Sequence, residues 1–93
     1  MKDKLLKIVQ HYGIEHQQRK LEEEVFELQQ AITNCEWASS EYGRCSKSNI
    51  IEELADTQVM LKQFQYYYEI TDDEIEEIMQ FKVDRQLERI EKE

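Results

Sequence analysis

The chain has 93 residues, of which 40% are hydrophobic and 35% charged, and its formal net charge at pH 7 is −9. This length suits one domain, residues 1–93, and a chain so short buries only about 60–65% of its unfolded surface, so association with further copies would add stability. The negative charge disfavours a nucleic-acid-binding surface, which needs clustered Lys and Arg, and no apolar run approaches the roughly 18 residues of a membrane helix.

The first ten residues, MKDKLLKIVQ, lack the long apolar stretch and the small-residue cleavage site of a secretory signal. We therefore expect a cytoplasmic protein. The two cysteines, Cys35 and Cys45, make neither a disulfide framework nor a zinc site. We expect both to be reduced thiols, with a disulfide between them as the alternative.

The absence of proline and the presence of only two glycines predict long helices and an all-α fold. A first helix is expected over residues 3–12, because Gly13 is suited to the left-handed turn that ends a helix. A second helix is expected over residues 15–34, where apolar residues recur at intervals of four and three and mark one buried face: Leu21, Val25, Leu28 and Ile32.

Residues 36–47, EWASSEYGRCSK, lose this periodicity and predict the one long loop. Asn49, answered by Glu52, is expected to cap a third helix that continues toward Ile70. Thr71 with Glu74 repeats the same pattern at the start of a fourth helix. These helices predict a four-helix up-and-down bundle whose core is completed by homo-oligomerisation.

Four acidic residues share one spacing on the second and third predicted helices. Glu24 and Glu27 are three residues apart, as are Glu53 and Asp56, so each pair projects from one face of its helix. Neighbouring helices would then face each other across four carboxylates, which repel one another unless cations neutralise them. The alternative is a solvated helix face, as acidic helix edges often are.

Oxygen ligands of this kind suit Mg²⁺, with Mn²⁺ as the alternative, better than zinc or copper. A di-iron bundle would need Glu-x-x-His pairs. Neither His11 nor His16 follows a glutamate by three residues, and we assign neither histidine a catalytic role.

The segments EEVFE (residues 23–27) and ELAD (residues 53–56) resemble the EExxE…ExxD signature of the MazG-like all-α nucleoside triphosphate pyrophosphohydrolases. The strings KLEEEVFEL, NIIEELADTQVML and KVDRQLERI are similar to the second, third and fourth helices of small phage- and Firmicute-type members of that family. The resemblance covers roughly residues 17–90.

This resemblance implies Mg²⁺-dependent hydrolysis of a (deoxy)nucleoside triphosphate between the α and β phosphates, giving the monophosphate and pyrophosphate. Metal ions stabilise the charge of such a transition state and align the attacking water. The implied metal ligands are the four acids named above: Glu24, Glu27, Glu53 and Asp56. Glu23 is the implied catalytic residue that orients or deprotonates the water, although the sequence leaves the roles of Glu23 and Glu24 interchangeable.

The predicted substrate-binding residues are basic or aromatic. Lys82, Arg85 and Arg89 form one face of the fourth predicted helix that suits phosphate oxygens, with surface ion pairing as the alternative. Lys20, one turn before Glu24, would support the acids or the phosphates. Trp37, in the long loop, would stack on a base or else seal a core.

Members of this family form dimers or tetramers with the active site near or across the subunit contact, so we expect a homodimer or homotetramer. Two other functions stay open: an enzyme resembling phosphoribosyl-ATP pyrophosphohydrolase, which uses related acids, and a non-catalytic helical module that binds nucleotide or protein. The sequence decides neither the base and sugar preference nor the number of metal ions.

Overall fold

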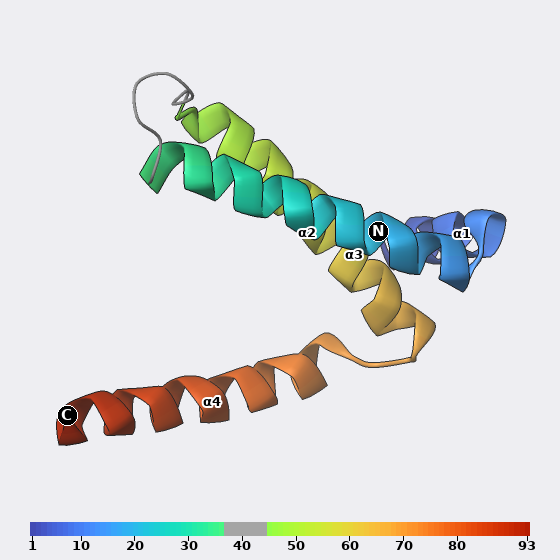
Figure 1. Ribbon diagram of the computed structural model, residues 1–93. Coiled ribbons are helices and arrows are strands. Elements are labelled where there is room, and N and C mark those ends of the chain that lie inside the picture. The colour runs from blue at the N-terminus through green and yellow to red at the C-terminus, as the bar shows by residue number, and fades with distance from the viewer. Residues whose placement is uncertain (37–44) are drawn as a thin grey trace.

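Four helices and no strand make up residues 1–36 and 45–93, the part of the chain that the computed structural model describes (Figure 1). The helices are α1 (Lys2–Tyr12), α2 (Ile14–Glu36), α3 (Lys47–Tyr67) and α4 (Asp72–Lys92). The predicted all-α class is therefore confirmed. None of the described helices combines the length and low polarity that crossing a membrane requires.

The helix ends follow the local sequence. Gly13 separates α1 from α2 with a φ of 89°, a backbone conformation that glycine adopts without steric cost, and its N–H donates to the Val9 carbonyl. Thr71 and Glu74 form the expected capping box at the start of α4. The expected cap of α3 was wrong: the helix begins three residues earlier than expected, so Ser46 is the N-cap, and its hydroxyl accepts from the Asn49 N–H at 3.2 Å.

Helices α2 and α3 lie side by side and antiparallel, and α1 packs against both (Figure 1). The buried positions of α2 are Gln17, Glu24 and Ala31, spaced by seven residues. Gln17 donates to Gln63 of α3 at 2.7 Å, and both amides are buried. The α2–α3 contact is therefore partly polar.

The predicted buried face of α2 was only half right. Leu21 and Leu28 are partly buried, but Val25 and Ile32 are 37% and 43% exposed in the single chain. The reason is geometric: the face turned toward α3 is centred on Glu24 and Ala31, so Val25 and Ile32 lie at its edge.

A disulfide joins Cys35, near the end of α2, to Cys45, just before α3. The expectation of reduced thiols was wrong. The antiparallel course of the two helices brings these Cα atoms to 4.2 Å, within reach of a covalent link. Disulfides are rare in the cytoplasm, so this bond weighs against the predicted cytoplasmic location, which stays a prediction.

Helix α4 extends away from the unit formed by α1, α2 and α3 (Figure 1). Among the described residues, no Cα atom of α4 lies within 8 Å of another helix, and no side chain of α4 is buried. Its large apolar side chains are correspondingly exposed: Ile75, Ile78, Met79, Phe81, Val83, Leu87 and Ile90. One chain alone therefore forms a three-helix unit with an appended helix, and the predicted four-helix core is not completed within it.

The first residue of α4 is nevertheless attached to the end of α3. Asp72 accepts hydrogen bonds from Lys62 at 2.7 Å, from Gln65 at 2.8 Å and from the Tyr66 hydroxyl at 3.3 Å. Lys62 first, and then Gln65, hold the pKa of Asp72 below its usual value. These contacts set the direction in which α4 leaves α3.

Because the pKa of Asp72 is lowered in the folded chain, the contribution of this junction is present above the unfolded pKa and is lost as pH falls through the folded one. Lys62→Met should raise the pKa of Asp72 toward its ordinary value, as measured by NMR titration of the carboxyl carbon, while the hydrogen bond from Gln65 still lowers it in part. Lys92→Met, which removes the same charge at the far end of α4, is the control. An unchanged pKa in Lys62→Met would contradict this account of the junction.

Candidate metal centre

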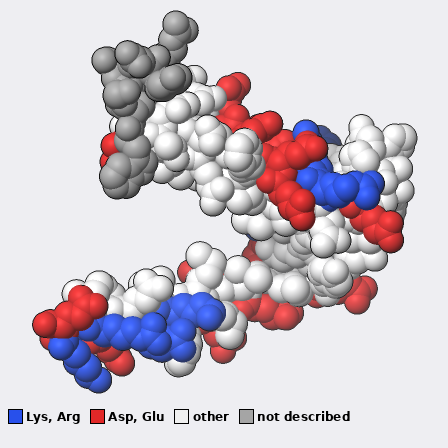
Figure 2. Space-filling view, in the orientation of Figure 1, with Lys and Arg blue, Asp and Glu red and all other residues white. Residues whose placement is uncertain are grey.

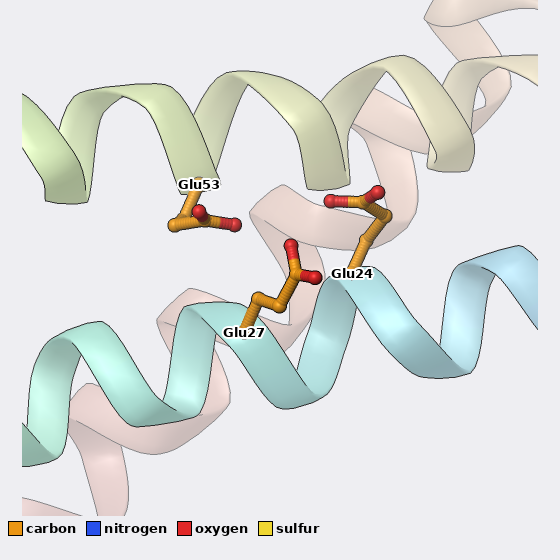
Figure 3. A group of neighbouring side chains, drawn as sticks. All are labelled: Glu24, Glu27 and Glu53. Atoms are coloured by element: carbon orange, nitrogen blue, oxygen red, sulfur yellow. The ribbon is translucent and has the colours of Figure 1, made fainter.

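Three carboxylates meet between α2 and α3. Glu24 and Glu27 project from α2 toward α3, and Glu53 projects from α3 toward α2 (Figure 3). One oxygen of each lies within 4.8 Å of the others. We call Glu24, Glu27 and Glu53 the carboxylate cluster.

Two oxygens of the cluster are buried without a protein partner. The side chain of Glu24 is only 9% exposed, and its Oε2 accepts no hydrogen bond from the described residues. The Oε2 atom of Glu53 is in the same state. Buried oxygens without a partner are costly, whereas the solvated-face alternative would leave them in water. Glu24 is therefore not part of a fully solvated helix face.

The surroundings of Glu53 disfavour its charge. Burial raises the pKa of its carboxyl, and repulsion from Glu27, Asp56 and Glu24 raises it further. A divalent cation among these oxygens would reverse this effect by favouring the ionised form.

Two further residues hold the cluster in place. The Thr57 hydroxyl, buried between the helices, donates to the Glu53 carbonyl at 2.8 Å and lies 3.5 Å from the Glu24 carbonyl. Lys20 Nζ lies 3.2 Å from Glu24 Oε1, and this pairing raises the pKa of the lysine. Lys20 leaves Glu24 Oε2 unpaired and so neutralises only part of the cluster's charge.

The other predicted residues of the site lie outside this cluster. Asp56 is exposed and does not reach the shared oxygen group, although its charge acts on Glu53. Glu23 is exposed and pairs with Lys20 at 3.5 Å. Trp37 lies outside the described residues.

The basic residues of α4 are not brought to the carboxylates within one chain. Lys82, Arg85 and Arg89 are exposed on a helix that lies apart from α2 and α3, and Lys and Arg side chains gather toward its C-terminal end (Figure 2). The Arg85 guanidinium lies 5.7 Å from the centre of the Phe81 ring. A phosphate-binding role for this face needs a second chain or a movement of α4.

Sequence reasoning missed Thr57 and the Gln17–Gln63 pair. The sequence did carry a signal for these contacts, because Gln17 lies on the same helical face as Glu24, and Thr57 on the same face as Glu53. Polar residues on a face otherwise read as apolar indicate a hydrogen-bonded interface. Gln63 is likewise a polar residue on the face of α3 that contacts α2.

The donor set consists of carboxylate oxygens, which fit Mg²⁺ or Mn²⁺ and not the softer metals. Comparison with protein-family models gives no match, and comparisons with curated proteins and with solved structures give none either. The MazG-like resemblance consequently rests on the sequence motifs alone and is carried forward as a proposal.

Proposed function

We propose that the carboxylate cluster binds Mg²⁺, or alternatively Mn²⁺, and that the chain hydrolyses nucleoside triphosphates between the α and β phosphates. The observation that carries this proposal is the buried Glu24 oxygen without a protein partner, in a carboxylate that lies beside those of Glu27 and Glu53. The EExxE…ExxD resemblance supplies the reaction type. The proposal makes the chain a MazG-like pyrophosphohydrolase.

The roles of the residues follow from their positions. Glu24, Glu27 and Glu53 hold the cation, and Asp56, one turn beyond Glu53 and exposed, completes the ligand set when substrate is bound. The bound cation supplies charge stabilisation to the phosphoryl oxygens and a template for substrate and water. Glu23 is exposed beside Glu24, where its carboxylate can accept a proton from the attacking water.

A second copy of the chain forms part of this proposal. The apolar residues of α4 are exposed, and a hollow of about 350 Å³ lined by Leu61, Ile75 and Met79, among others, separates α4 from α3. Helix α4 of one chain packing on another would cover these residues and bring Lys82, Arg85 and Arg89 toward a phosphate-binding position. Light scattering at micromolar concentration should give a dimer or tetramer, and a strict monomer would contradict this part.

The reaction is tested by measuring pyrophosphate and nucleoside monophosphate released from a panel of ribo- and deoxyribonucleoside triphosphates. We expect turnover with Mg²⁺, none with EDTA, and a loss of about 100-fold or more in Glu27→Gln, since removal of one group that stabilises transition-state charge typically has this effect. Glu22→Gln is the matched control, because Glu22 is an exposed neighbour on the same helix.

Two results distinguish the remaining possibilities. If Mg²⁺ raises the melting temperature but no triphosphate is cleaved, the cluster binds metal and serves another substrate, of which phosphoribosyl-ATP is the first to try. If Mg²⁺ changes neither the melting temperature nor turnover, the carboxylates are a structural feature of the helix contact and the proposed function is wrong.

A further inference from the structure

A hollow of about 480 Å³ opens at the start of α2, beside the carboxylate cluster. It is lined by Tyr12, His16, Gln17, Arg19, Lys20 and Glu23. Its volume lies in the range of small-molecule sites. We call it the aromatic hollow.

One wall of the aromatic hollow is a pair of stacked rings. Tyr12 at the end of α1 and His16 in the first turn of α2 have ring centroids 4.9 Å apart and planes 15° from parallel. The turn at Gly13 brings the two rings together. Tyr12 remains 55% exposed, so a planar group can stack against the pair, as bases do on aromatic side chains.

A partly buried hydrogen bond orients the histidine, and its partner, Gln17, is held by a buried one. Gln17 Nε2 donates to Gln63, which leaves Gln17 Oε1 to accept from His16 Nδ1 at 2.8 Å. Nδ1 therefore carries a proton, and Nε2 of the neutral ring is an acceptor. The ring thus offers a flat face and one acceptor edge, the features that recognise a heterocycle with an exocyclic amine.

The aromatic hollow connects directly to the carboxylate cluster. Lys20 lines the hollow and pairs with Glu24, and Arg19 adds a second positive charge to the lining. Along α2, His16 and Glu24 are two turns apart, about 12 Å. Figure 2 shows Lys and Arg side chains next to acidic side chains on the first half of α2. A ligand with a planar ring at one end and metal-bound phosphates at the other matches this order of groups.

We propose that the aromatic hollow binds the nucleobase of the substrate, stacked on Tyr12 and His16, while its phosphates lie at the carboxylate cluster. This inference rests on the proposed function and extends it to base recognition. Tyr12 and His16 are then substrate-binding residues, which the sequence alone did not suggest. Lys20 and Arg19 lie between the base and the metal, where the ribose and the α phosphate pass.

The experiment compares Tyr12→Ala with Tyr12→Phe, which keeps the ring, and with Tyr68→Ala, which alters another exposed tyrosine, at the end of α3. Three quantities are measured: KM and kcat for nucleoside triphosphates with Mg²⁺, inhibition by inorganic tripolyphosphate, which has no base, and binding of uncharged nucleosides by NMR. Loss of base stacking should raise KM about 10-fold in Tyr12→Ala. The kcat and the inhibition by tripolyphosphate should stay unchanged, and both control variants should behave as wild type.

The outcomes separate this inference from the proposed function. If triphosphates are hydrolysed and Tyr12→Ala changes neither KM nor nucleoside binding, the aromatic hollow is not the base site, although the proposed reaction is correct. If no triphosphate is cleaved but nucleosides shift the His16 resonances in wild type and not in Tyr12→Ala, the hollow binds bases and the proposed reaction is wrong. An equal loss of tripolyphosphate inhibition in Tyr12→Ala would also overturn the inference, because a base-stacking residue cannot affect a ligand without a base.

Discussion

Glu53→Gln should lower Mg²⁺-dependent hydrolysis by about 100-fold or more and at the same time raise the melting temperature of the metal-free protein. The two effects have one cause. Burial and the neighbouring charges of Glu27, Asp56 and Glu24 raise the pKa of Glu53, so its ionised form is disfavoured in the folded chain. A neutral glutamine keeps the shape and removes the repulsion. The repulsion within the carboxylate cluster should therefore destabilise the metal-free protein.

The pyrophosphate-release assay checks the loss of hydrolysis, and thermal melts with EDTA and with Mg²⁺ check the change in stability. Mg²⁺ should raise the melting temperature of wild type, because a ligand that binds only the folded state stabilises it, and should leave Glu53→Gln unchanged. Glu52→Gln, its exposed neighbour on α3, controls for the loss of one charge. A metal-free Glu53→Gln protein that melts below wild type would show that the carboxylate has a structural role instead.

Replacement of both cysteines by serine should lower the free energy of unfolding by about 3 kcal/mol, the loop-entropy value for a link closing a segment of this length. The disulfide joins residues ten apart in sequence. In a domain of this size, the melting temperature changes by about 4–8 °C for each kcal/mol of stability. The melting temperature should therefore fall by more than about 10 °C. The double variant is preferred because it leaves no free thiol.

The control is wild type with a reducing agent, which should match the double variant, while the double variant itself should not respond to the reagent. Since Cys35 is eight residues from Glu27 and Cys45 eight residues from Glu53, the variant should also bind Mg²⁺ more weakly. A change in melting temperature below about 2 °C would mean that packing of α2 on α3 alone closes this end of the unit.

Much of the secondary structure could be predicted from the sequence, because the signals are local. Gly13 and the Thr71–Glu74 capping box mark helix ends wherever the helices lie in space. Ser46 was missed as the cap of α3 because Asn49 offers a competing signal three residues later. Both residues take part in the observed cap, as acceptor and donor.

The face that each helix turns to its neighbour could not be predicted from apolar spacing. On α2, Leu21 and Leu28 belong to two overlapping faces, one with Val25 and Ile32 and one with Glu24 and Ala31. The prediction that the face with Val25 and Ile32 is buried was wrong for the single chain. The hydrogen bonds of Gln17 and Thr57 favour burial of the face that contains Glu24. The exposed Val25 and Ile32 are then available to a further helix.

The candidate site was predicted in part. The spacing of the acids placed Glu24, Glu27 and Glu53 on facing helix surfaces, and the structure brings these three together. Asp56 lies one turn further along α3 and stays exposed. The position of α4 depends on contacts with no sequence signal, so the sequence could not show that its basic face lies away from the carboxylates.

The buried Gln17–Gln63 pair has a consequence for how uniquely the two long helices pair. Gln17 lies opposite Gln63 at one end, Glu27 faces Glu53 in the middle, and Cys35 meets Cys45 at the other end. Sliding α2 by one turn along α3 would bury both amides without partners, a cost that apolar contacts do not impose. A single buried polar pair can fix the register of paired helices in this way. Replacing both glutamines by leucine would thus permit shifted alignments, in which Glu24 and Glu27 no longer meet Glu53.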